Sequence, residues 1–443
     1  MLYRLLSLFG LVVMVGIGYS LSVNRKGIRW KTVAWGLGLQ FLFGLILIIP
    51  AVQDFFFIVV DDGVKVLLSF AEDGARFVFG SFSGYNLVDA DGNAASVGPG
   101  QIGPPMLTLA FWVLPTIVFF SSLMSVLYHL GVMQRLVIGI AWVMQRTMGT
   151  SGAESLSAAA NIFVGQTEAP LVIKPYVQTM TRSELHAIMT GGFATVAGGV
   201  MAAYVQFLSG SIDGIAGHLV TASILSAPAA LAISKVMYPE DGAPVTLNNL
   251  TMSNEKTARN VLEAAAQGAS EGGRLAINVT AMLIAFVGLI SMADWMLTLL
   301  PMTFCEGSPS LGYNTACDPL TLSQILGWLF APLALAMGVP WAEAGIVGTL
   351  LGEKLVLTEF VAYMHLGQIL SETPDALSPR SAIIASYALC GFANFASIGI
   401  QLGGIGGIAE DRMGDLAELG FRAMIAGSLA GFMTATVAGV LLV

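Results

Sequence analysis

The chain has 443 residues, of which 56% are hydrophobic and only 11% are charged, and its mean hydropathy is +0.78. A soluble domain carries about 25% charged residues, so lipid must cover much of this protein. The net charge of −9, together with the absence of a basic patch, excludes nucleic acid as a partner. The composition therefore predicts an all-α integral membrane protein.

A membrane-spanning helix needs about 20 predominantly apolar residues. The first apolar segment is followed by a basic cluster and not by a small-residue cleavage site, so we interpret it as a span and not as a removed signal peptide. Three polar stretches, 80–105, 238–259 and 301–320, are expected to form loops. Eight segments qualify as spans: 5–23, 32–50, 106–130, 184–208, 212–237, 275–300, 381–402 and 417–443.

Two further apolar stretches, 150–180 and 340–370, have a polar centre. Each is predicted to form a re-entrant hairpin, in which two half-helices enter and leave the membrane on the same face. Backbone at membrane depth must be satisfied by protein or by a water-filled cavity. The half-helix ends at such tips can therefore bind a cation or a polar solute.

Lysine and arginine concentrate in the connections on one side of the eight spans, and the positive-inside rule makes that side cytoplasmic. Both chain ends and residues 301–320 are then expected outside. Cys305 and Cys317 would lie in an oxidising compartment if this is a bacterial envelope protein. They form either a disulfide that closes a short loop or two free thiols, whereas Cys390 lies in an apolar run and is interpreted as a packing residue.

The chain also resembles itself, because four short motifs recur in the same order. By the count of spans the two copies face opposite sides, so they form an inverted repeat, which predicts a transporter with a midplane site. The expected units are N-terminal scaffold helices (1–130), a first repeat (131–237), a cytoplasmic loop with a helix start (238–274) and a second repeat (275–443). The paired motifs are Met148–Glu154 with Met337–Glu343, Thr167–Glu168 with Thr358–Glu359, Arg182–Ser183 with Arg380–Ser381, and Gly192–Thr195 with Gly391–Asn394.

Glu168 and Glu359 are the strongest candidates for a functional site. A carboxylate at membrane depth is costly and is a functional candidate by default. The alternatives are a structural ion pair with Lys174 or Lys354, or a tip that lies in water. Both copies of the repeat carry the glutamate, which favours a role in binding.

Other polar side chains lie close to these glutamates in sequence. Gln166 and Thr167 precede Glu168 and offer donors and acceptors, although they could also cap the second half-helix. Asn394 and Ser397 are three residues apart on one helix face, and Phe392 adds an aromatic wall. Their alternative roles are interhelical hydrogen bonds and lipid contact. The glycine-rich run that follows Ser397, Gly399–Gly407, predicts a bent or unwound backbone.

Four oxygen ligands could form a cation site: the side chains of Asn161 and Thr195 and the carbonyls of Val164 and Val196. The alternative is packing, which is common for Asn and Thr in membrane helices. The glycine pairs Gly191–Gly192 and Gly198–Gly199 predict an interrupted helix around Thr195, which favours the cation site. The four histidines show no ligand spacing, and the chain has no Walker motif, so ATP-driven transport is unsupported. A secondary transporter is the preferred hypothesis, and a membrane-embedded enzyme and a passive channel are the alternatives.

Three runs give the chain a recognisable resemblance. Gly165–Pro170 is similar to the first-hairpin motif of concentrative nucleoside transporters, and Gly352–Lys354 with Glu359–Tyr363 is similar to their second-hairpin signature. Cys390–Gly399 resembles the seventh-helix motif of that family. The resemblance extends over essentially the whole chain. It implies eight spanning helices with two opposed hairpins, a homotrimer in the bacterial inner membrane, and import of nucleosides with a cation.

The resemblance also implies roles for individual residues. Uridine or other pyrimidine nucleosides are the expected substrates, and purine nucleosides are a second class. The protein is expected to be surrounded by membrane lipid. Asn161 and the hydroxyl of Thr195 favour sodium over a proton as the coupling ion. The family has Asn where this chain has Thr358, which puts the packing at the second tip in question. The implied nucleoside ligands are Gln166, Thr167 and Glu168 of the first hairpin and Glu359, Phe392, Asn394 and Ser397, and the implied sodium ligands are Asn161, Val164, Thr195 and Val196.

Overall fold

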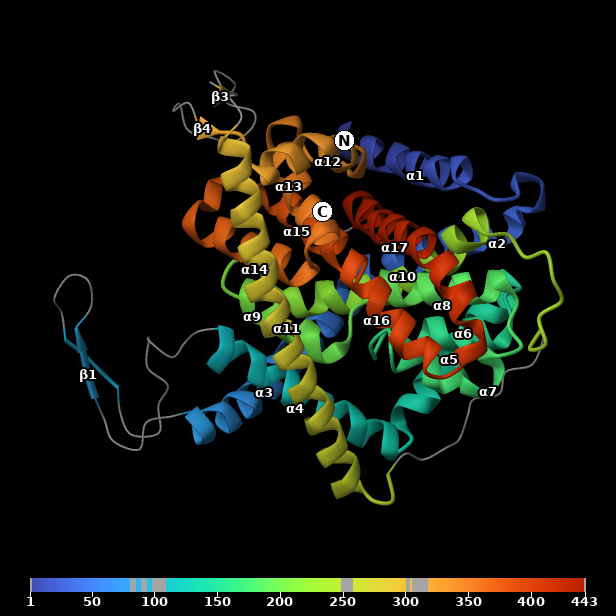
Figure 1. Ribbon diagram of the computed structural model, residues 1–443, viewed down its shortest axis with the longest axis horizontal. Helices are drawn as coiled ribbons and strands as arrows, with labels where there is room; N and C mark the ends of the chain where they lie inside the picture. Colours follow the sequence, from blue (N-terminus) through green and yellow to red (C-terminus); the bar gives the residue numbers. More distant parts are fainter. Residues whose placement is uncertain are drawn as a thin grey trace.

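The computed structural model describes residues 2–79, 85–88, 94–97, 109–247, 258–299, 303–304 and 318–441. Their regular secondary structure is helical apart from two short antiparallel strand pairs, so the predicted helical class is confirmed in its main part (Figure 1). Strand β1 (Tyr85–Val88) pairs with β2 (Ala94–Val97), and β3 (Thr303–Phe304) pairs with β4 (Asp318–Pro319). Cys305 and Cys317 lie outside the described residues, so their disulfide stays a prediction.

The N-terminal part contains one helix that we did not predict, α3 (Pro50–Phe79). Acidic and basic residues interrupt the apolar run of this helix, and for this reason we did not predict it as a span. Its Phe57 ring packs edge-on against His218, with ring centroids 4.9 Å apart. The neighbouring helices are α1 (Leu2–Ser20), α2 (Trp30–Ile48) and α4 (Leu114–His129), the last preceded by the π-helical turn Leu109–Val113.

Two series of helices follow in the same order, separated by the long helix α11 (Val261–Thr298). Each series has a surface helix, a hairpin, a span in two pieces and a long buried helix. The first series is α5 (Val132–Met148), α6 (Gly152–Ala160), η4 (Ala169–Ile173), α7 (Lys174–Val177), α8 (Arg182–Ala194), α9 (Gly198–Leu208) and α10 (Ile215–Met237). The second is α12 (Leu322–Met337), α13 (Trp341–Val356), α14 (Glu359–Glu372), η6 (Pro374–Ala376), α15 (Pro379–Leu389), α16 (Phe395–Gly406), η7 (Glu410–Arg412) and α17 (Met413–Leu441).

Corresponding residues of the two series have the same local structure. The helices α5 and α12 both end at a left-handed glycine, Gly149 with φ of 67° and Gly338 with φ of 97°. The helices α8 and α15 both begin at a hydroxyl N-cap, Thr181 and Ser378, whose oxygens accept from a backbone N–H of the first turn. In Figure 1 the hairpin helices α6 and α7 lie on the opposite side of the molecule from α12 and α13.

Each series has a broken span. Residues 195–197 separate α8 from α9, between the two glycine pairs at which an interruption was expected. In the second series we expected a bent or unwound backbone over Gly399–Gly407, and this was wrong, because α16 continues to Gly406. The break lies upstream at 390–394, where Gly391 has a φ of 137° and Asn394 caps the new helix.

Six described helices or broken helices are long and apolar enough to cross a membrane, and the number rises to eight if each of two bent helix pairs is one span. Those six match the predictions 5–23, 32–50, 184–208, 212–237, 275–300 and 417–443. The predicted span 106–130 corresponds to α4, which is bent by 78° against α5. The predicted span 381–402 consists of the two shorter helices α15 and α16.

The core forms around α10 and α17, which are buried along most of their length. In contrast, only 18% of the apolar window of α11 is buried, and Figure 1 shows this helix crossing in front of the other helices. An apolar helix with so little protein around it requires lipid or another apolar surface.

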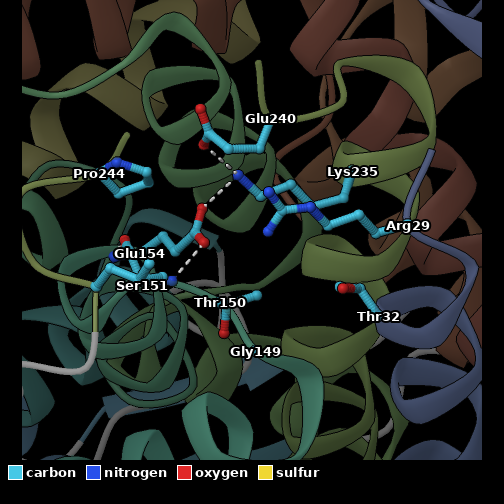
Figure 2. A pocket seen from close by; sticks show the side chains of 10 residues that line it. Arg29, Thr32, Gly149, Thr150, Ser151, Glu154, Lys235, Glu240 and Pro244 are labelled. Carbon is cyan, nitrogen blue, oxygen red and sulfur yellow. Dashed lines mark hydrogen bonds and ion pairs between the residues drawn. The ribbon is translucent and has the colours of Figure 1, made fainter. Parts of the chain in front are cut away.

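The base of the first hairpin is held by a buried ionic cluster, shown in Figure 2. The Nζ of Lys235 on α10 lies 2.7 Å from Oε2 of Glu154 on α6 and 3.2 Å from Oε2 of Glu240. It also donates to the hydroxyl of Ser183 on α8 at 2.9 Å. Glu154 in turn accepts from the backbone N–H of Ser151 at 2.7 Å. One cation thus joins three segments.

Replacing Lys235 with Met should strongly destabilise the fold, because Glu154 and Glu240 would remain buried without their cation. Breaking a buried pair in this way costs about 3–5 kcal/mol. Thermal unfolding of the detergent-solubilised protein measures the loss. Arg76→Met is the control, since the side chains of Arg76 and of its partner Glu72 are 44% and 28% exposed, and its loss should leave the melting temperature near wild type. Equal melting temperatures for the two variants would contradict the account.

Candidate functional site

The two broken spans meet at their breaks. The backbone N–H of Phe392 donates to the carbonyl of Thr195 at 3.3 Å. A Cβ atom at Gly391 would lie 2.8 Å from the carbonyl oxygen of Phe193 and 2.9 Å from that of Ala194. Gly391 is thus required both by its positive φ and by the approach of the other chain segment. The backbone groups that the two interruptions leave free are brought to one place.

The tip of the first hairpin lies against both broken spans. The carbonyl of Phe163 in the tip accepts from the N–H of Gly198 at the start of α9, at 3.1 Å. Gln166 is buried, and its Nε2 donates to the hydroxyl of Ser397 on α16 at 3.1 Å. Thr167 packs on α16 at Gly404, where a Cβ would lie 2.8 Å from its Cγ2.

Glu168 differs from its neighbours in the tip because its side chain is exposed. Its backbone N–H donates to the carbonyl of Gly165 at 3.2 Å, which closes the turn. The sequence suggested that Glu168 and Glu359 are equivalent, and the structure places them in different environments. The carboxylate of Glu168 folds back over its own turn beside Gly165 and has the hydroxyl of Thr167 as a hydrogen-bond partner, whereas Glu359 bonds to residues of other helices.

Glu359 is the first residue of α14, at the tip of the second hairpin, and it is buried. Its Oε1 accepts from the hydroxyl of Tyr204 on α9 at 2.9 Å, and its Oε2 accepts from Nδ2 of Asn394 at 2.8 Å. Lys354, the cation of the alternative ion pair, instead donates to the carbonyl of Ala388 at 2.8 Å. The hydrogen bonds favour a site carboxylate over a structural ion pair.

Thr358, the residue that departs from the family pattern, caps the helix that carries Glu359. Its hydroxyl accepts from the N–H of Val361 at 3.4 Å. The hydroxyl of Thr suits this place as an N-cap. The substitution of Asn by Thr therefore preserves the start of α14.

The start of α16 joins the two tips. Asn394 caps α16 by accepting from the N–H of Ser397 at 2.8 Å, and its amide donates to Glu359. Ser397 accepts from Gln166. Gln166, Ser397, Asn394 and Glu359 thus form one continuous hydrogen-bonded chain, with half-buried Phe392 just before it in sequence. The structure brings together polar residues that the sequence separates by more than 200 positions.

Two residues of this group were not predicted. Tyr204 lies in an apolar run of α9 and has no signal in the sequence beyond its type. Gln401 is fully buried on α16 and donates from Nε2 to Oε1 of Gln166 at 3.0 Å. It lies four residues after Ser397 and therefore on the same helix face, so the periodicity of α16 could have identified it.

The predicted cation ligands lie on two segments that contact each other beside the first break: Phe163 accepts from the N–H of Gly198, and a Cβ at Gly191 would lie 3.3 Å from Nδ2 of Asn161. Nδ2 of Asn161 donates to the carbonyl of Ser157 at 3.1 Å, and within the part of the chain that the structure describes its buried Oδ1 has no hydrogen-bond partner. Thr195 ends α8 and donates to the carbonyl of Gly191 at 3.0 Å. Val164 lies in the turn after α6, and Val196 lies in the break.

This donor set fits a hard monovalent cation, because neutral carbonyl and side-chain oxygens are the ligands such ions prefer. The unpaired Oδ1 of Asn161 is the observation that supports the fit, since a buried polar atom without a partner is costly. A bound cation would satisfy that oxygen and would lie next to the tip that carries Gln166.

Long apolar helices, two broken helices that meet at their breaks and two hairpins with polar tips are typical of transporters of the interrupted-helix type. Three family models match the chain in order. They describe the Na+-dependent nucleoside transporter N-terminus (residues 9–82), nucleoside recognition (residues 110–211) and the Na+-dependent nucleoside transporter C-terminus (residues 218–439).

The chain belongs to the family of Na+-dependent nucleoside transporters. It is therefore an integral, multi-pass membrane protein of a transporter family and not an enzyme, and the membrane-embedded enzyme is excluded. An uncharacterized transporter of Haemophilus influenzae is 44% identical over 98% of this chain and 96% of its own length.

Mammalian relatives are longer than this chain. Solute carrier family 28 member 3 of Rattus norvegicus is 40% identical over 99% of this chain but 59% of its own length, and the rat sodium/nucleoside cotransporter 1 is 39% identical over 99% and 64%. Among solved structures, CNTnw in an inward-facing substrate-bound state matches with a TM-score of 0.83 at 40% identity, covering 99% of this chain and 98% of that chain.

Gly391→Ala should destabilise the protein by at least about 2 kcal/mol, because a side chain is strained at this φ and would collide with two carbonyls. Gly399→Ala is the control, since Gly399 lies inside α16 with open space around the added atom and Ala favours a helix. In thermal unfolding, the melting temperature should fall for Gly391→Ala and should stay level or rise for Gly399→Ala. A Gly391→Ala protein as stable as wild type would show that the crossing tolerates a side chain there.

Proposed function

We propose that this protein imports nucleosides together with sodium ions across a bacterial inner membrane. The observation that carries the proposal is the hydrogen-bonded chain from Gln166 through Ser397 and Asn394 to Glu359. It joins both hairpin tips where the broken spans cross, which is where interrupted-helix transporters bind their solute. The names of the relatives, which include a sodium/nucleoside cotransporter, support the same substrate and ion.

The chemistry of the two tips matches the two halves of a nucleoside. Glu359 is a carboxylate with about four acceptor positions, of which Tyr204 and Asn394 occupy two. The others can accept from two vicinal ribose hydroxyls, with Asn394 and Ser397 completing the ribose contacts. The amide of Gln166 and the hydroxyl of Thr167 face the base, Glu168 adds an exposed acceptor, and Phe392 packs against the nucleoside.

Uridine and other pyrimidine nucleosides are the first substrates to test, and purine nucleosides are the second. Transport proceeds by alternating access, in which the part that contains the hairpins moves relative to the scaffold. The protein works as a homotrimer in lipid, and each protomer transports by itself. The exposed apolar surface of α11 supports such an assembly.

Sodium binds at Asn161, Thr195 and the carbonyls of Val164 and Val196. The ion holds the first tip so that Gln166, Thr167 and Glu168 point toward the solute. By linkage, sodium and nucleoside then raise each other's affinity by the same factor. A proton is the alternative coupling ion, and exposed Glu168 would carry it.

Glu359→Gln should abolish nucleoside uptake while the protein remains folded. The amide loses the charge and one acceptor that the ribose hydroxyls require, and charge-assisted hydrogen bonds are about twice as strong as neutral ones. Uptake of labelled uridine into cells or proteoliposomes measures the effect. Glu372→Gln, at the exposed far end of the same helix, should transport normally. Uptake near wild type in Glu359→Gln would assign Glu359 a structural role.

Asn161→Ala should raise the sodium concentration needed for uptake and flatten the dependence of nucleoside binding on sodium. The variant removes the unpaired Oδ1 but no group proposed to contact the nucleoside, so the ranking of nucleosides should stay unchanged. Titrating binding against sodium, with choline as the replacement cation, measures both quantities. Wild-type uptake that ignores sodium and follows a pH gradient would overturn the sodium assignment.

A further inference from the structure

The side chain of Gln401 donates hydrogen bonds to two other segments of the protein. It is fully buried on α16, and its Nε2 donates both to Oε1 of Gln166 at 3.0 Å and to the backbone carbonyl of Met189 at 3.1 Å. A Cβ atom at Gly192 would lie 2.8 Å from that Nε2 and 2.9 Å from Cβ of Gln166. Gly192 therefore provides the space in which the two amides meet.

We infer that Gln401 is a positioning residue that fixes which way the amide of Gln166 faces and thereby sets the base preference of the transporter. The inference rests on the proposed function, in which Gln166 contacts the base. Gln401 itself is not proposed to touch the nucleoside.

A backbone carbonyl determines which amide groups donate and which accept in this set of hydrogen bonds. The oxygen of Met189 can only accept, so the NH2 group of Gln401, and not its oxygen, must face it. The second hydrogen of the same NH2 group then points at Gln166, which must present its oxygen. Reversing Gln166 would set two NH2 groups against each other.

The other partner of Gln166 does not fix its orientation. Nε2 of Gln166 donates to the hydroxyl of Ser397, and a hydroxyl can either donate or accept. Ser397 would therefore accommodate a reversed amide equally well. Of the two side chains that bond the Gln166 amide, Gln401 is the one that selects a single orientation.

A fixed amide distinguishes bases that differ in donors and acceptors. Uridine and cytidine share the same ribose, but uridine has a carbonyl and an N–H on the edge where cytidine has an amino group and a bare nitrogen. The ratio of their dissociation constants cancels the ribose contacts and isolates the base edge. With Gln166 locked, one of the two bases should leave a buried polar group unpaired.

The test is competition binding of uridine and cytidine to purified protein in sodium. Wild type should favour one of them by at least about fivefold, the size expected for one mispaired buried group. Gln401→Met keeps the volume but frees Gln166 to reverse, so the ratio should move toward 1 by about threefold or more. Gln401→Leu serves the same purpose if the Met variant does not fold. Gln368→Met, on the exposed side of α14, is the control and should keep the wild-type ratio.

A double-mutant cycle shows whether Gln401 acts through Gln166. In a Gln166→Ala background, Gln401→Met should no longer change the ratio. The inference is overturned if wild type discriminates by less than fivefold, if Gln401→Met weakens both nucleosides equally, or if its effect persists without Gln166. Failure of wild type to bind either nucleoside would instead overturn the proposed function itself.

Discussion

An interrupted helix in a bilayer leaves backbone N–H and C=O groups that lipid cannot satisfy, and this constraint organises the structure. Here two interruptions meet, with Phe392 donating to the carbonyl of Thr195 and Gly391 against two further carbonyls of the other span. The two breaks therefore supply a hydrogen-bond partner for each other's free backbone groups. Other polar groups at the breaks bond to the hairpin tips: the N–H of Gly198 donates to the carbonyl of Phe163, and the amide of Asn394 donates to Glu359.

The hairpins can present polar tips because other parts of them are held firmly. Lys235 joins the base of the first hairpin to α8 and α10. In the second repeat, Glu343 accepts from both the backbone N–H and the hydroxyl of Ser378 at 3.0 and 2.9 Å. Lys354, on α13, donates to the carbonyl of Ala388 just before the second break. Buried and half-buried charges thus hold the two hairpins, and the candidate site itself uses mainly neutral groups and Glu359.

Much of this arrangement could be predicted from the sequence, because its signals are local. The apolar windows predicted the six helices that are long and apolar enough to cross a membrane, and the recurring motifs contain the two glycines, Gly149 and Gly338, that end α5 and α12. The amphipathic helix α3 was missed because its charges break every apolar window. The second break was placed too far along the chain, because glycine content does not distinguish a close-packed helix from an unwound one.

The sequence singled out most of the polar residues of the candidate site but not the contacts between them. Pairs such as Gln166 with Ser397 depend on how two distant breaks cross, which a single sequence does not encode locally. For the same reason the different environments of Glu168 and Glu359, the contact of Tyr204 and the role of Gln401 emerged only in three dimensions.

A structure of the sodium-loaded protein with uridine bound would test the central claim most directly. The account predicts the base beside Gln166 and Thr167, the ribose on Glu359 and Asn394, and a cation within ligand distance of Oδ1 of Asn161. A nucleoside bound away from the crossing of the two breaks, with the chain from Gln166 to Glu359 untouched, would contradict it.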